Sequence, residues 1–89
     1  MFTVYVLYSP SFDKTYTGFS SNVEARFLSH NLRSKKGYTV RYRPWLILYT
    51  EQWSDKAQAM KRERYLKSGS GRAFRKRLVA NWKRSHGID

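Results

Sequence analysis

The chain has 89 residues, enough for one domain and too few for a second. It contains no cysteine, which excludes disulfides and cysteine-ligated zinc or iron–sulfur centres. No apolar run approaches the ~18 residues of a membrane span, and Met1 leads into strand-like sequence without the basic region of a signal peptide. We therefore expect a soluble, cytoplasmic, single-domain protein without a membrane partner.

Charge is the strongest compositional signal. Eighteen Lys and Arg against six Asp and Glu give a net charge of +12, and such a field concentrates polyanions near the protein. A generally basic protein and a binder of anionic membrane surfaces are alternatives. Because the basic residues are interleaved with aromatic ones instead of lying on one amphipathic helix, nucleic acid is the favoured partner.

The chain begins with a predicted β-hairpin. Residues 2–8 are β-branched and aromatic and predict a strand. Residues 9–13 have turn-forming chemistry, and residues 14–19 predict a second, antiparallel strand. Two strands this short are not stable alone, so a third strand or a helix must cover one face.

A helix is predicted to follow over residues 22–31. Ser21 and Glu24 match the capping box, in which each side chain satisfies a free backbone N–H of the first turn. Arg26 and His30 stand four positions apart, so they project from one side of this helix and can act on a single site.

The second half is predicted to contain one more strand and two helices. The apolar run at 45–50 is the best candidate for a buried central strand. Helices are predicted over 55–67 and 71–83, separated by a Gly- and Ser-rich break. The last helix carries four basic residues outward: Arg72, Arg75, Lys76 and Arg77.

The resulting order, ββαβαα, describes an α+β domain with a small three-stranded antiparallel sheet flanked by three helices. We place this domain at residues 1–83 and expect a frayed tail at 84–89.

Phosphate chemistry needs a metal ligand, a cation and a base for water. Four of the six carboxylates have structural explanations: a turn (Asp13), the capping box (Glu24), a helix start (Asp55) and the terminus (Asp89). Glu51 and Glu63 remain. Glu63 lies among basic neighbours, as expected of a metal ligand beside a phosphate. An ordinary i, i+4 ion pair with Lys67, worth ~0.3–0.5 kcal/mol, also explains it.

The other candidates have structural alternatives too. Arg26 suits a phosphate clamp or a solvated helix face. His30 suits proton transfer or packing. Tyr5 and Tyr16 lie on partnered strands and could face each other, although strand tyrosines commonly serve packing.

The full ordered set resembles the GIY-YIG nuclease superfamily. The set is Thr3-Val4-Tyr5, Tyr16-Thr17-Gly18, Arg26, His30 and Glu63. The likeness is closer to the small stand-alone, excision-nuclease-like members, which share the run Tyr38-Thr39, Arg43-Pro44-Trp45, Leu48-Tyr49, Glu51, Ala59, Lys61-Arg62-Glu63 and Leu66-Lys67. Both tripeptides depart from Gly-Ile-Tyr and Tyr-Ile-Gly, but each keeps its tyrosine, and Gly18 is retained.

The resemblance implies a mechanism. Glu63 would be the only protein ligand of Mg²⁺ or Mn²⁺, and Arg26 would neutralise charge on the phosphate. Tyr5 would be the general base and Tyr16 would orient water or phosphate, or the two would exchange roles. His30 would take or share the phenolic proton. Six further residues would bind substrate: Lys14, Gly18, Tyr38, Arg72, Arg75 and Lys76. The last three belong to the basic helix, which would contact backbone phosphates.

The leading hypothesis is therefore a metal-dependent endonuclease acting on DNA more readily than RNA, with structure-selective cleavage in DNA repair or recombination as its suggested role. A non-catalytic nucleic-acid-binding module is the alternative from another class. A third hypothesis is a nuclease that cuts only when a partner protein delivers its substrate.

Overall fold

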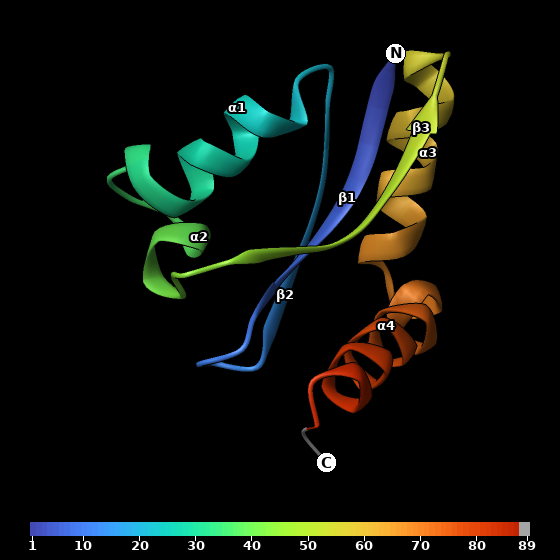
Figure 1. Ribbon diagram of the computed structural model, residues 1–89. Helices are drawn as coiled ribbons and strands as arrows, with labels where there is room; N and C mark the ends of the chain where they lie inside the picture. The colour runs from blue at the N-terminus through green and yellow to red at the C-terminus, as the bar shows by residue number, and fades with distance from the viewer. Residues whose placement is uncertain (88–89) are drawn as a thin grey trace.

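The computed structural model describes residues 1–87 and confirms the predicted α+β class (Figure 1). Its elements are β1 (Phe2–Ser9), β2 (Lys14–Ser20), α1 (Val23–Leu28), the π-helical η1 (Ser29–Arg33), α2 (Tyr38–Arg41), β3 (Leu46–Trp53), α3 (Lys56–Lys67), the 3₁₀-helical η2 (Gly69–Gly71) and α4 (Arg72–Ser85). The short helix α2 was not predicted, because its four residues carry no helical periodicity of their own. Among residues 1–87, no helix is long and apolar enough to span a membrane.

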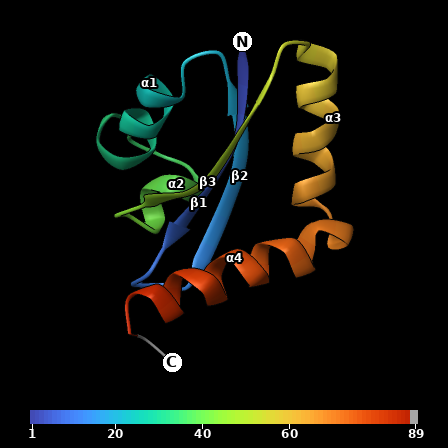
Figure 2. The same cartoon turned by 45° about the vertical axis from the view of Figure 1, so that its right-hand side comes forward.

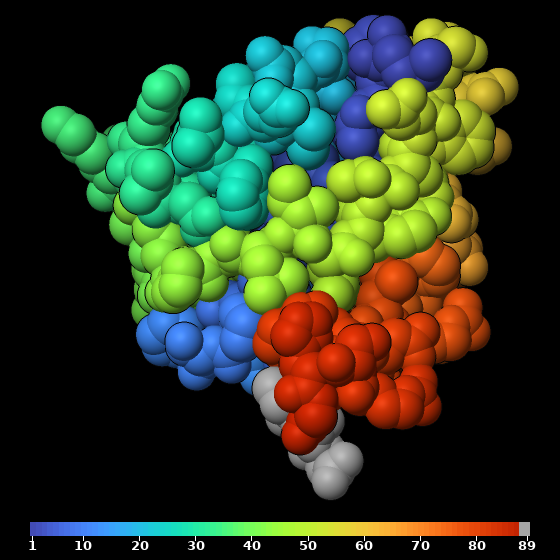
Figure 3. All heavy atoms as spheres, viewed as in Figure 1, coloured from blue at the N-terminus to red at the C-terminus, as the bar shows by residue number. Residues whose placement is uncertain are grey.

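The three strands form one antiparallel sheet in the order β2-β1-β3. The prediction that the apolar run at 45–50 would be the buried central strand was wrong. The central strand is β1, which is buried without interruption from Val4 to Ser9. β3 is an edge strand whose residues alternate in exposure, and Ile47 is 42% exposed. Figure 3 shows β3 lying at the surface between α1 and α4. An apolar run does not by itself distinguish a central strand from an edge strand.

Helices cover the two faces of the sheet. In Figure 2, α1 and α2 lie on one side, α3 lies on the other, and α4 crosses the end of the sheet near the hairpin. Val4 packs on the α3 side with Ala59 and Leu66. Tyr5, the next residue of β1, points to the opposite face and packs with Trp45, as the alternation of a strand requires.

The start of α1 differs from the prediction. Ser21 and Glu24 do not form a capping box; Asn22 is the N-cap, and its side chain accepts a hydrogen bond from the Ala25 N–H at 3.1 Å. Ser20 accepts from the Asn22 N–H at 2.9 Å. Because β2 continues to Ser20, the first helical residue is Val23, and the cap falls on the residue immediately before it.

The last two helices are joined by a close contact. A Cβ built on Gly71 would lie 2.5 Å from the Leu66 carbonyl oxygen, so only glycine permits this approach. Arg75 donates from Nη1 to the carbonyls of Leu66 and Ser68, which satisfies the end of α3. α4 then runs to Ser85, so the part of the expected tail at 84–85 is helical. Residues 88 and 89 lie outside the described part of the chain.

Candidate active site

The hairpin brings together the two motif tyrosines. Tyr5 on β1 pairs with Gly18 on β2, and Tyr16 lies diagonally across, with the two ring centroids 6.5 Å apart. A Cβ on Gly18 would approach the Tyr5 hydroxyl oxygen to 2.5 Å and its Cζ to 2.7 Å. The glycine is therefore required for the Tyr5 ring to lie across β2, and its structural role is to make room for this hydroxyl.

A buried hydrogen-bond chain runs from Tyr5 through His30 to Thr39. The Tyr5 hydroxyl lies 3.0 Å from His30 Nε2, and His30 Nδ1 lies 3.1 Å from Thr39 Oγ1. When Nδ1 carries the ring hydrogen and donates it to Thr39, Nε2 accepts from the Tyr5 O–H. Tyr5 is 1% exposed and His30 is 5% exposed. The arrangement can therefore pass a phenolic proton to an imidazole out of contact with bulk water.

Two residues outside the predicted set hold His30 in place. Arg43 donates from Nε to the His30 carbonyl at 2.5 Å, and from Nη2 to Ser29 and Ser34 at 3.0 and 2.7 Å. Asn31 Oδ1 accepts from the Trp45 N–H at 2.6 Å, and Asn31 Nδ2 donates to the Trp45 carbonyl at 2.9 Å. A lone arginine or asparagine in sequence gives no sign of such partners. The only signal was that Arg43 precedes the Pro-Trp pair of the resemblance.

Burial sets the ionisation of the two central groups. It raises the pKa of the Tyr5 phenol, and the nearby Arg26 guanidinium only partly opposes this effect. Burial also lowers the pKa of the His30 imidazole, with Arg26 and Arg43 adding to the shift. In the free protein both groups are neutral at pH 7, so Arg26 alone does not stabilise a tyrosinate.

The acidic side of the site is contributed by α3. The side chain of Glu63 is 14% exposed and lies near enough to Tyr5 to raise the pKa of its phenol. Its Oε2 lies 3.0 Å from Lys67 Nζ, in an i, i+4 ion pair. The ordinary helical pair predicted for Glu63 is therefore present, and the carboxylate also lies close enough to Tyr5 to act on it electrostatically.

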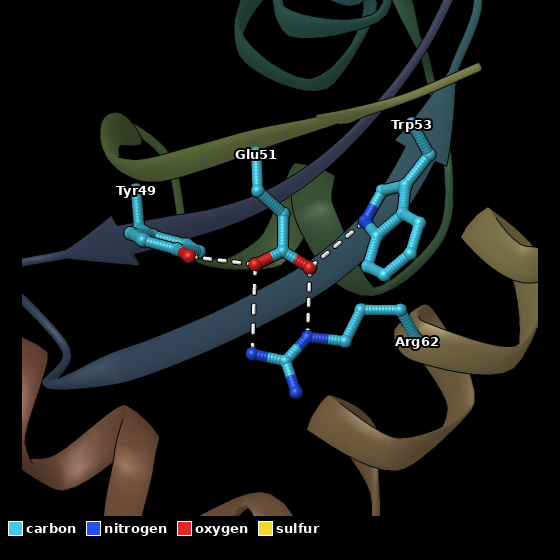
Figure 4. A network of polar contacts seen from close by, with 4 residues as sticks. All are labelled: Tyr49, Glu51, Trp53 and Arg62. Atoms are coloured by element: carbon cyan, nitrogen blue, oxygen red, sulfur yellow. Dashed lines mark hydrogen bonds and ion pairs between the residues drawn. The ribbon is translucent and has the colours of Figure 1, made fainter.

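Glu51, the other carboxylate left open by elimination, is committed elsewhere. It accepts hydrogen bonds from Tyr49 at 2.6 Å, Trp53 at 3.0 Å and Arg62 at 2.7 Å (Figure 4). Burial raises the pKa of the Glu51 carboxyl, but these hydrogen bonds together hold it below its ordinary value. The network joins β3 to α3 through Arg62, the residue before Glu63. It therefore fixes which face of α3 lies toward the site.

The remaining carboxylates have structural positions. Asp13 adopts a positive φ of 54° in the hairpin turn and accepts a hydrogen bond from Tyr8 at 2.7 Å. Burial and, to a smaller extent, this hydrogen bond raise the pKa of the Tyr8 phenol to about 12. Asp55 caps α3 by accepting from the Gln58 N–H at 3.1 Å. The structure thus supports the predicted roles of Asp13 and Asp55.

The donor set at Glu63 fits only a sparsely ligated ion. Within residues 1–87, no three His, Cys, Asp or Glu side chains gather as a ready metal cluster. Mg²⁺ retains several waters and commonly binds through one or two carboxylates plus substrate phosphates. A single partly exposed carboxylate, already paired with an ammonium group, meets that requirement. It would not meet the four-ligand requirement of structural zinc.

The predicted substrate-binding residues, apart from Gly18, line a hollow of about 800 Å³ between the hairpin and α4. They are Lys14, Tyr38, Arg72, Arg75 and Lys76. Lys83 also lines the hollow, and its Nζ lies 3.7 Å from Asp13 Oδ1. Sequence reasoning missed Lys83 because it fell at the expected end of the helix. A smaller hollow of about 240 Å³ lies next to Tyr16.

The fold and this constellation agree with the comparisons. The family model described as the GIY-YIG catalytic domain matches residues 1–77, a nuclease-type domain. The chain belongs to the GIY-YIG family, which confirms the resemblance found in the sequence.

Its relatives include proteins of similar length. It is 41% identical over 78 residues to a UPF0213 protein of Natronomonas pharaonis, covering 88% of this chain and 89% of that protein. It is 34% identical over 88 residues to a UPF0213 protein of Limosilactobacillus reuteri, covering 97% and 85%. A UPF0213 protein of Staphylococcus haemolyticus is 44% identical over 55 residues, covering 62% and 67%. No solved structure matches the chain significantly.

Proposed function

We propose that this protein is a divalent-metal-dependent endonuclease that hydrolyses phosphodiester bonds in DNA. The observation that carries the proposal is the buried chain from Tyr5 to His30 to Thr39, with Arg26 and Glu63 acting on the same phenol. A packing tyrosine has no need of both a neutral imidazole acceptor and a nearby carboxylate.

The general base in this proposal is Tyr5 acting through His30. As the Tyr5 hydroxyl takes a proton from the attacking water, its own proton passes to His30 Nε2, and Thr39 holds the ring at Nδ1. This route does not require a free tyrosinate, which burial disfavours. Tyr16 is only partly buried and orients the water or the phosphate.

Charge on the phosphate is met by two groups. The Arg26 guanidinium is permanently charged and neutralises charge that develops on the non-bridging oxygens. Glu63 would hold Mg²⁺ or Mn²⁺, and the ion would supply Lewis-acid stabilisation of the negative charge on the leaving group. Glu63 and Arg26 are therefore expected to be indispensable, each contributing roughly 10²–10³ in rate.

Substrate binding is proposed to use the larger hollow. The basic side chains that line it would contact backbone phosphates without reading bases. They are Lys14, Arg72, Arg75, Lys76 and Lys83. Binding of this kind suits recognition by the shape of the nucleic acid, so we propose structure-selective cleavage in DNA repair or recombination, with a partner protein delivering some substrates.

A binding module without catalysis is the second candidate. The observation that favours it is the ion pair of Glu63 with Lys67, which satisfies the carboxylate without a metal. The experiment incubates the protein with labelled linear, nicked and branched DNA, and with matching RNA, in Mg²⁺, Mn²⁺ or EDTA. The endonuclease predicts metal-dependent cuts in DNA. Salt-sensitive binding without cuts on every substrate would favour the binding module.

A further inference from the structure

The smaller hollow lies where the candidate active site meets the larger basic surface. Six residues line it: Thr15, Tyr16, Thr17, Tyr38, Lys67 and Arg75. Tyr16 belongs to the candidate site, whereas Thr15, Tyr38 and Arg75 also line the larger hollow. The smaller hollow therefore adjoins both the larger one and Tyr16.

Lys67 occupies a distinctive position at this point. Its Nζ lies 3.0 Å from Glu63 Oε2 and 5.7 Å from the centre of the Tyr16 ring. The helical i, i+4 spacing explains the ion pair. It does not explain why the ammonium group also lies over Tyr16 and lines the hollow, in a site whose other residues come from β2, α2 and α4.

The two cations of the hollow are held to different degrees. Arg75 is fixed by the hydrogen bonds of its Nη1 to the carbonyls of Leu66 and Ser68. The side chain of Lys67 is 48% exposed, while that of its partner Glu63 is 14% exposed. The pair therefore joins a half-exposed ammonium group to a largely buried carboxylate, and water can solvate Lys67 once the charge of Glu63 is neutralised.

We propose that the smaller hollow is a subsite for a backbone phosphate of nucleic acid and that Lys67 is its movable ligand. Lys67 pairs with Glu63 in the free protein. It turns to the phosphate when the charge of Glu63 is neutralised, as a bound divalent cation would do. The identity of the ligand rests on the proposed function, but the exchange of partners does not depend on cleavage.

The exchange is tested by DNA binding in EDTA, where no cut can occur. The probe is a fluorescein-labelled DNA duplex, and its affinity is measured as a function of NaCl concentration. Lys67→Met, Glu63→Gln and the double substitution form a double-mutant cycle. Lys67→Arg tests whether another positive charge at this position restores the contact. The matched control is Lys61→Met, which removes the same charge from an exposed position of α3.

In the Glu63→Gln background, Lys67→Met should reduce the slope of log K against log[salt] by about 0.9, the value for one phosphate contact. In the native background the loss of affinity should be about twofold smaller, because Glu63 still holds part of the lysine population. Lys67→Arg should keep the slope, and Lys61→Met should change it far less than Lys67→Met. Circular dichroism melting of each variant shows that the fold is retained.

Equal effects of Lys67→Met in the two backgrounds would overturn the exchange, and an effect no larger than that of Lys61→Met would overturn the phosphate contact. These results are separate from those for the proposed function. If the protein cuts no DNA but shows the coupling, the subsite stands and the proposed nuclease function fails. If the protein cuts DNA without the coupling, only the subsite fails.

Discussion

The hydroxyl of Tyr5 lies 3.0 Å from Nε2 of His30, in a buried contact that joins the central strand β1 to the π-helical turn after α1. Both residues are neutral in the free protein, because burial raises the pKa of the phenol and lowers the pKa of the imidazole. Transfer of a proton from the phenol to the imidazole is therefore uphill in the free protein, and in the proposed mechanism it accompanies transfer of a proton from the attacking water to Tyr5.

Removing the Tyr5 hydroxyl should therefore abolish most of the cleavage. Tyr5→Phe is expected to lower kcat by roughly 10²–10⁴, the usual contribution of general base catalysis, and to leave DNA binding intact. Tyr16→Phe should lower kcat less and should preserve the pH dependence that His30 gives to the native rate. If Tyr16→Phe instead removes that pH dependence while Tyr5→Phe keeps it, the roles of the two tyrosines are reversed.

The lowered pKa of His30 also predicts how stability depends on pH. The unfolded imidazole binds a proton below its ordinary pKa of 6.5, while the buried one remains neutral to lower pH. Its contribution to stability is therefore fully present above pH 6.5 and is lost as the pH falls through the lowered pKa. Urea unfolding at pH 7.5 and 5.5 should show a smaller loss for His30→Gln than for the native protein. His86→Gln, at an exposed position after α4, is the control and should behave as the native protein does.

Gly18 gives a prediction about packing alone. A methyl group at this position would meet the Tyr5 hydroxyl oxygen at 2.5 Å, so Gly18→Ala should destabilise the fold by about 1–3 kcal/mol. Gly69→Ala is the matched control, since a Cβ there meets nothing within 4 Å. Thermal unfolding of the two variants measures the difference. Equal melting temperatures would show that the Tyr5 ring does not lie across β2 in solution.

The network around Glu51 predicts a link between stability and activity. Glu51→Gln should cost roughly 1–3 kcal/mol, because Arg62 loses the carboxylate that accepts from it at 2.7 Å. Since the pKa of Glu51 is lowered in the fold, this stabilisation is present above pH 4.5 and disappears as the pH falls through the lowered pKa. Cleavage should also weaken at a temperature where the variant is folded, because α3 carries Glu63. Arg64→Met, at an exposed position of the same helix, should leave both quantities unchanged.

The sequence was most informative where local chemistry decides the structure. The hairpin, the cap at Asp55 and the break at Gly69–Gly71 all follow from short-range preferences, and the structure contains them. Strand order was not predictable in this way. The apolar runs at 2–8 and 45–50 look alike in sequence, and only packing against helices on both faces makes β1 the central strand.

The same distinction between local and long-range causes applies to the residues of the candidate site. The expected hairpin placed Tyr5 and Tyr16 together, and the family resemblance added His30 to them; the centres of the three rings lie within 6.5 Å of one another. Thr39, Arg43 and Asn31 were missed as supports of His30, because each acts through a contact distant in sequence. Lys67 appeared in the sequence only as a possible helical partner of Glu63. Its place over Tyr16 depends on how α3 packs against β2.

The role of Glu63 is tested by comparing Glu63→Gln with Glu24→Gln, which removes an equal charge from an exposed position of α1. Cleavage of labelled DNA in Mg²⁺ and DNA affinity in EDTA are measured for both. We expect Glu63→Gln to lose at least ~10² in cleavage rate while binding DNA at least as tightly as the native protein, and we expect Glu24→Gln to cut normally. Undiminished cleavage by Glu63→Gln would contradict the assignment of Glu63 as the metal-binding carboxylate.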